Sequence, residues 1–297
     1  MPVSCTPTST YGLVIGWGEA ATKILISYGQ RRSVARSRRR NARLTMAGDI
    51  MPPVLMYHSV APQRRDPAPW TVSPKRFDQQ MRWLSRRGRT GVSMRELLEA
   101  RRNGSRRDLV GLTFDDGYAD FAEYALPVLQ RYGFTATVFV IAGRLGGYNT
   151  WVEGARKPLM TAGQLRQLAA GKIEIGSHGL HHVSLLSVTD ADLSGEIEMS
   201  RRVLQEVSDQ DVPGFCYPYG EHDGRVISAV QAAGYDYCCA VGYSEFTGRY
   251  ALPRIDIVDS DSWPFLWAKG THYWLRWEYR GPGSRFLVSA SRLRAGL

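Results

Sequence analysis

Short apolar runs and amphipathic segments alternate along the chain from residue 52 onward. Apolar residues at helical spacing, such as Phe77, Met81 and Leu84, recur between the apolar runs. The runs predict buried strands at 54–57, 109–114, 136–141, 173–175, 214–217, 235–240 and 252–257. The segments between them predict a helix that opens at Ser73-Pro74 and helices at 93–102, 120–132, 161–170, 189–207 and 225–233. This alternation favours a parallel sheet, open or closed into a barrel.

The same pattern divides the chain of 297 residues. We expect one α/β domain over 51–280, a basic arm over 1–50 and a tail over 281–297, since single α/β barrels often span about 200–250 residues. A membrane-spanning helix needs about 18 or more apolar residues in succession, and the best candidate, 11–28, is interrupted by Glu19 and Lys23. No segment has the order of charges and apolar residues of a secretory signal, which favours a cytoplasmic location.

Charge changes how the arm is interpreted. Residues 1–48 hold eight basic residues and one acidic residue, so they carry +7 of the net charge of +10. Self-repulsion between the arginines of 31–43 predicts disorder there. A solvated tail, or translation that starts at Met46 or Met51, explains the arm most simply. Attraction to phosphate or anionic lipid and a targeting role are the alternatives. The rest of the chain gives no sign of specific nucleic-acid binding.

Four cysteines in a chain of this length do not form a disulfide framework. Cys238 and Cys239 are neighbours in a predicted strand, where successive side chains point to opposite faces. We therefore expect reduced, mostly buried thiols.

Polar clusters follow four of the apolar runs, and carboxyl ends of parallel strands converge on one face. These clusters are His58, Asp115-Asp116-Gly117, His178 to His182, and Tyr217 to Gly220. An Asp-Gly pair is also a common turn, and a histidine cluster can simply face solvent. Histidines at i and i+4, however, share one side of a helical turn and can hold one cation with a carboxylate, leaving positions open for water and substrate.

Three ordered motifs resemble the polysaccharide deacetylase family, the NodB-homology carbohydrate esterases. They are Thr113 to Gly117, Ser177 to His182 and Tyr217 to Gly220, and the resemblance covers roughly 52–277. It implies a distorted (β/α) barrel in a single domain and a hydrolase that removes N-acetyl groups from a glycan. It further implies that Asp116, His178 and His182 bind a divalent ion, with zinc expected and Co, Ni or Mn as alternatives. Asp115 would be the general base, and the backbone N–H of Tyr219 would contribute to an oxyanion hole.

Two departures from the common family pattern concern the other catalytic groups. The late Leu-x-His motif that often carries the general acid has no match here, whereas residues 53–58 resemble the amino-terminal motif of the poly-N-acetylglucosamine deacetylases. We therefore expect His58 to be the acid, the alternative being a histidine hydrogen-bonded at a strand end. Cys216 stands in the region where the family often has an arginine that pairs with the base. Arg254 is the candidate replacement, unless it forms only a structural or surface salt bridge.

Substrate identity is the least determined property. Trp151, in a Gly-rich loop, could stack on a sugar ring, although loop aromatics more often cover the edge of a core. Trp263, Trp267, Trp274 and Trp277 make the carboxyl-terminal region aromatic. Packing on the barrel is their expected role, with docking to a membrane or a glycan-assembly enzyme as the lesser alternative. Hydrolysis of a small non-sugar amide and glycan binding without catalysis are the competing functions.

Overall fold

The computed structural model describes residues 51–62, 68–104, 108–152, 156–261 and 269. The expectations for the arm over 1–50, for the tail over 281–297 and for the four carboxyl-terminal tryptophans lie outside these residues. None of the helices in the described ranges is long and apolar enough to span a bilayer. The cytoplasmic location stays a prediction.

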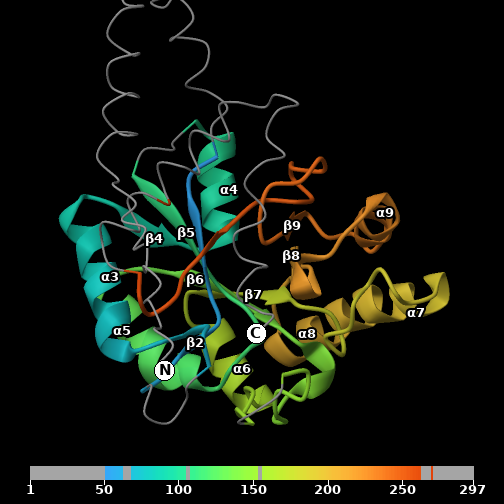
Figure 1. Cartoon of the computed structure of the whole chain (residues 1–297), viewed down its shortest axis with the longest axis horizontal. Coiled ribbons are helices and arrows are strands. Elements are labelled where there is room, and N and C mark those ends of the chain that lie inside the picture. Colours follow the sequence, from blue (N-terminus) through green and yellow to red (C-terminus); the bar gives the residue numbers. More distant parts are fainter. Residues whose placement is uncertain (1–50, 63–67, 105–107, 153–155, 262–268, 270–297) are drawn as a thin grey trace, which may run out of the picture. The chain divides into compact units, whose positions relative to one another are not determined.

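One curved parallel sheet forms the centre of the domain, as the alternation predicted (Figure 1). Its strands are β1 (Val54–Tyr57), β4 (Thr90–Val92), β5 (Leu109–Phe114), β6 (Ala136–Val140), β7 (Ile173–Ser177), β8 (Gly214–Cys216), β9 (Tyr237–Cys239) and β10 (Ile255–Asp256). Their spatial order is β10-β1-β5-β6-β7-β8-β9, with β4 also paired to β5. The strands are short and almost entirely buried, as expected when both faces of a parallel sheet are covered.

The segment 252–256 links the two ends of this sheet. Leu252 exchanges hydrogen bonds with β9, at 2.9 Å to Cys238 O and 2.8 Å from Ala240 N. Ile255 and Asp256 then pair with β1. The prediction of one strand over 252–257 is therefore wrong, because the chain changes partner around Pro253, which has no N–H to donate. The change of partner curls the sheet into the distorted barrel that was expected.

Helices cover the outside of the sheet, with α3 and α5 packed together and α6 packed on α8 (Figure 1). Their bounds are α3 (Pro74–Arg86), α4 (Met94–Arg102), α5 (Leu126–Tyr132), α6 (Ala162–Ala170), α7 (Asp190–Ser194), α8 (Ser200–Ser208) and α9 (Gly224–Ala232). Ser93 and Thr161 begin α4 and α6 with reciprocal capping boxes. These two helices thus start where a polar side chain satisfies free backbone N–H groups.

Two predicted helices contain a wider π turn. The helix expected over 120–132 begins with the π turn η2 (Phe121–Ala125), and the helix expected over 189–207 is divided by η4 (Gly195–Met199). The sequence also gave no sign of β4 or of the small sheet formed by β2 (Ser59–Val60) and β3 (Thr71–Val72). Strands of two or three residues are too short to show a periodic pattern.

Candidate active site

A cavity of about 400 Å³ opens at the carboxyl ends of the strands. Seven of the eight predicted site residues line it: His58, Asp115, Asp116, Trp151, His178, His182 and Tyr219. The eighth, Arg254, is fully buried behind Asp115. Residues that are up to 161 positions apart in sequence are therefore brought together, because each follows a strand that ends at the same face.

Asp116 faces both histidines of the predicted ligand set. Its Oδ1 atom lies 3.4 Å from Nε2 of His178 and 3.4 Å from Nε2 of His182. One ligand atom from each residue can be chosen so that all lie within 4.8 Å of one another, and all three side chains are buried. Two imidazoles and one carboxylate suit zinc, which takes nitrogen and oxygen ligands at about 2.0–2.2 Å. These residues fit a divalent ion.

The tautomer of His178 also suits a ligand. Its Nδ1 lies 2.8 Å from the carbonyl oxygen of Cys216, which can only accept, so Nδ1 carries the proton. Burial lowers the pKa of His178 to about 4, so the ring is neutral near pH 7. Nε2 therefore presents a free lone pair toward Asp116. An imidazole held by its other nitrogen in this way is the usual arrangement around a bound metal.

The reason for the His178–His182 pairing differs from the one predicted. Residues 178–182 form an irregular loop after β7, so the expectation that a helical turn aligns the two rings is wrong. Gly179 and His182 have φ of +79° and +62°, which bends the chain back on itself. The two ring centroids lie 5.0 Å apart. A tight loop thus achieves the approach that was attributed to helical spacing.

Asp115 is bound by the arginine that the sequence suggested as its partner. Arg254 donates from Nη1 to Oδ1 at 2.6 Å and from Nη2 to Oδ2 at 2.8 Å. Burial by itself raises the pKa of Asp115, but the charge and hydrogen bonds of Arg254 outweigh it and hold that pKa well below its ordinary value. Asp115 is therefore a fixed, ionised carboxylate beside Asp116.

Cys216 completes the surroundings of this pair. Its Sγ lies 3.0 Å from Nη2 of Arg254 and 3.6 Å from Oδ2 of Asp115. Asp115, His178 and Cys216 also lie close enough together to hold an ion. Burial raises the pKa of the Cys216 thiol well above its ordinary value, however, and a protonated thiol is a poor ligand. We therefore favour the set with Asp116.

Backbone strain is concentrated at this cavity. Asp116, His182 and Tyr219 have φ of +72°, +62° and +59°, and all three line it. A left-handed backbone in a residue other than glycine costs on the order of 1–3 kcal/mol and persists where the surrounding structure enforces it. Such strain is typical of functional sites.

Aromatic side chains form the walls of the cavity. Trp151 stacks on His182, with ring centroids 4.6 Å apart, and Tyr219 meets His182 edge to face at 4.6 Å. His58 lies at the end of β1, and its buried Nδ1 has no hydrogen-bond partner among the described residues. For Nδ1, the structure therefore does not support the alternative that His58 is simply hydrogen-bonded at a strand end.

Comparison with known proteins supports the same chemistry. The family model described as polysaccharide deacetylase matches residues 102–238, which include both aspartates and the histidine loop. The chain is 29% identical to YxkH of Bacillus subtilis over 210 residues, 69% of this chain and 71% of YxkH. The chain resembles the polysaccharide deacetylases over this stretch.

Two further comparisons agree with this resemblance. A poly-beta-1,6-N-acetyl-D-glucosamine N-deacetylase of Staphylococcus aureus is 24% identical over 202 residues, 64% of this chain and 69% of that protein. The structure of the Streptococcus pyogenes deacetylase PplD in complex with acetate matches with a TM-score of 0.63 and 26% identity, covering 73% of this chain and 97% of PplD. The family match begins after His58 and ends before Arg254, and the roles of all eight predicted site residues stay predictions.

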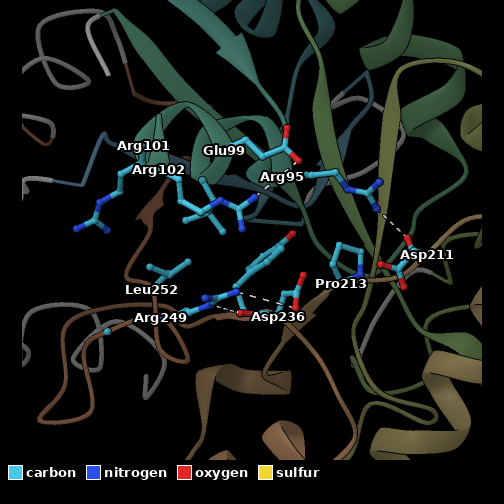
Figure 2. Close-up of a pocket in the computed structure, with 12 residues that line it drawn as sticks. Arg95, Glu99, Arg101, Arg102, Asp211, Pro213, Asp236, Arg249 and Leu252 are labelled. Carbon is cyan, nitrogen blue, oxygen red and sulfur yellow. Dashed lines mark hydrogen bonds and ion pairs between the residues drawn. The ribbon is translucent and has the colours of Figure 1, made fainter. Parts of the chain in front are cut away.

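The domain has a second cavity, of about 590 Å³, at the amino ends of β8 and β9 (Figure 2). Several arginines line it, but the figure shows Arg95 directed to Asp211 and Arg249 to Asp236. Arg95 bonds to Asp211 O at 2.9 Å. Arg95 and Arg249 thus already have acceptors, and no predicted site residue lines this cavity. The cavity at the carboxyl ends of the strands is therefore the better candidate for the reaction.

Among the cavity residues that sequence reasoning missed, two could contact a substrate. Trp70 lies just before β3 and Asp256 lies in β10, and both line the cavity. Trp70 carries no sequence signal, because the strand that follows it is only two residues long. Asp256 did have a sequence signal. It follows Arg254 by two positions, and side chains two positions apart lie on the same side of an extended segment.

Proposed function

We propose that this protein is a polysaccharide deacetylase, a metal-dependent hydrolase that removes N-acetyl groups from an amino-sugar polysaccharide, oligosaccharide or glycan precursor. The observation that carries the proposal is the position of Asp116 Oδ1, 3.4 Å from both histidine Nε2 atoms and next to a second, ionised carboxylate. That arrangement provides a ligand set and a separate base within one buried cluster.

Asp116, His178 and His182 would hold the ion, with zinc favoured by the donor set and Co, Ni or Mn as alternatives. When bound, such an ion polarises an amide carbonyl and lowers the pKa of a bound water toward about 7. Asp115 would accept the proton of the attacking water. Its two oxygens are fixed by Arg254, so its orientation is set before substrate arrives.

The remaining groups would act on the substrate. The backbone N–H of Tyr219 would stabilise the oxyanion that forms from the acetamide oxygen. His58 would then give a proton to the leaving amine, a role that a positioned histidine often fills as a general acid. Trp151 would pack against the sugar ring and orient the acetamide. The C–N bond breaks, the water oxygen remains on the acetate, and the amine remains on the sugar.

A poly-N-acetylglucosamine chain is the substrate class we favour. The Staphylococcus aureus relative is named for removing acetyl groups from the β-1,6-linked polymer. The open cavity with aromatic walls is compatible with a sugar ring, as Trp151 and Tyr219 both flank the ligand His182. Peripheral contact with a membrane or with glycan-assembly enzymes remains a separate hypothesis for the regions outside the described residues.

The decisive experiment measures acetate release from β-1,6- and β-1,4-linked N-acetylglucosamine oligomers. We expect release with added Zn²⁺ or Co²⁺, loss of release with a chelator, and recovery when the metal is restored. Asp116→Asn should bind the ion weakly and release little acetate. Release from small cyclic amides but not from sugars would contradict the substrate class. Glycan binding without any acetate release by metal-loaded protein would contradict the enzymatic function.

A further inference from the structure

A buried carboxylate outside the cavity contacts the loop that carries the two histidines. Glu196 lies in η4, and only 8% of its surface is exposed. Its Oε2 accepts hydrogen bonds from the backbone N–H groups of Leu180 and His181, each at 3.0 Å. Its Oε1 accepts from Nδ1 of His181 at 2.6 Å. Every one of these donors belongs to the segment between His178 and His182.

The loop is also held from its other side. The N–H of Ala142 donates to Gly179 O at 3.0 Å, and the N–H of Gly143 donates to Leu180 O at 2.8 Å. A side chain at residue 143 would collide with Leu180 O, since an added Cβ would lie 2.6 Å from it. The peptide groups around Leu180 are therefore fixed through their carbonyls by residues 142–143 and through their N–H groups by Glu196.

Two features of Glu196 need an explanation beyond helix stability. It lies on the buried side of its helix, with Leu193 three residues before and Leu204 eight residues after, all buried. A buried carboxylate is unfavourable unless it is fully hydrogen-bonded. It also lies in a π turn, a rare irregularity that is frequent at functional sites. An apolar residue would be more favourable at this buried position. The carboxylate is therefore explained by the N–H groups of the loop that it binds.

The geometry points to Glu196 as a positioning residue for the metal site, which fixes the loop 178–182 so that His178 and His182 face Asp116 together. This inference rests on the proposed function. Glu196 does not line the cavity, and it acts through backbone N–H groups and through His181. It explains the third histidine of the motif, whose side chain is 49% exposed and does not line the cavity.

The test compares Glu196→Ala and Glu196→Gln with a matched control from the same π turn. Glu198 is exposed, bonds to Ser194 Oγ at 2.7 Å and pairs with Arg202 at 3.7 Å, so Glu198→Gln removes an equal charge without touching the loop. Metal-free protein is titrated with Zn²⁺ and Co²⁺ against a chromophoric chelator. The Co²⁺ absorption spectrum, kcat and KM are then recorded for each loaded variant, with thermal unfolding as the check of folding.

We expect Glu196→Ala to weaken metal binding about 10–100-fold, the range found when residues that support metal ligands are removed. Its Co²⁺ spectrum should change, and kcat should fall with little change in KM because Glu196 is remote from the substrate. Glu196→Gln keeps an acceptor for the two N–H groups and should lie between Ala and the wild type. It also keeps the size of the side chain, so the test holds if the alanine variant does not fold. Glu198→Gln should match the wild type.

Wild-type affinity, spectrum and kcat in folded Glu196→Gln and Glu196→Ala would overturn the positioning role while leaving the proposed function intact. A loss of the same size in Glu198→Gln would also overturn it, because charge in the π turn would then explain the effect. A wild-type chain that binds neither ion would remove the proposed function and this inference with it.

Discussion

Arg254 donates one hydrogen bond to each carboxylate oxygen of Asp115, at 2.6 and 2.8 Å, from a position 139 residues later in the chain. The guanidinium is fully buried and is also bonded to Ala240 O, Thr113 Oγ1 and Cys216 Sγ. Asp115 thus has its arginine partner in the segment before β10, where the sequence suggested a candidate. Cys216 occupies the space beside it.

Arg254→Lys should lower kcat at least about 10-fold and leave KM nearly unchanged. Lysine cannot make the two parallel bonds that orient Asp115, and Arg254 does not line the cavity. Steady-state kinetics on metal-loaded protein checks this. Arg249→Lys, at an exposed arginine of the second cavity, is the control and should keep wild-type kinetics. Unchanged kcat in Arg254→Lys would mean that the pair has a structural role only.

His58→Ala should lower kcat by about 10²–10⁴-fold, the usual contribution of a general acid. Metal affinity should stay at the wild-type value, because His58 does not belong to the ligand set that the structure brings together. Acetate release and metal titration are measured on the same preparation. Full turnover by a metal-loaded alanine variant would assign the acid to another group.

Trp151→Ala should raise KM for N-acetylglucosamine oligomers by roughly 2–10-fold, since an aromatic contact contributes about 0.5–1.5 kcal/mol beyond area burial. Trp151→Phe keeps a flat apolar face and should lose less. Trp83→Phe, at a tryptophan of α3 that does not line the cavity, is the control. A normal KM in the alanine variant would favour the view that Trp151 only covers the edge of the core.

Stability should depend on pH through Glu174, which lies in β7 away from the cavity. Burial raises the pKa of its carboxyl above the ordinary 4.5, although Thr137, the N–H of Arg95 and Tyr237 all donate to it. A carboxyl whose pKa is raised by folding favours the folded state below its unfolded pKa, and the benefit is lost as pH rises through the folded pKa. The free energy of unfolding of the wild type, relative to Glu174→Gln, should therefore fall as pH rises from about 4 to 8. Urea unfolding at several pH values measures this difference, and a difference that is constant with pH would refute it.

The three cysteines of the described residues should not react with thiol reagents in the native protein. Cys216, Cys238 and Cys239 are buried and unpaired in disulfides, and burial raises the pKa of each thiol, to about 12 for Cys239. Reaction requires the thiolate. In a Cys5→Ser variant, a chromogenic disulfide reagent should label no thiol before unfolding and three after it. Rapid labelling of the native variant would show that one of these sites is open.

The architecture was predictable because its signals are local and repeated. Apolar composition marks the buried strands at 54–57 and 109–114, and capping residues mark the starts of the helices at 93–102 and 161–170. The structure confirms all four elements. The convergence of Asp116, His178 and His182 followed from strand ends in a parallel sheet. What failed depends on distant partners: the interruption of 252–257 is set by β9 and β1 together, and no short window contains both.

The supporting groups around the site were harder to find for the same reason. Arg254 could be proposed only because Cys216 departed from an expected pattern. Glu196 is an acid in an apolar stripe, which is a usable signal, but its contacts with Leu180 and His181 cross from one element to another. Loop conformations such as that of 178–182 also depend on φ values that sequence spacing does not reveal. The approach of His178 and His182 was therefore predicted correctly, but from a helical turn that the structure does not contain at these residues.

The pairing of β1 with β10 places the first and the last strand of the described residues side by side, in register from Leu55 with Ile255. His58 directly follows β1, and Arg254 directly precedes β10. A gene rearrangement that joined these neighbours and opened the chain elsewhere would preserve the spatial position of both side chains. Evolution can therefore shuffle the order in which such a domain is encoded while its chemistry stays the same.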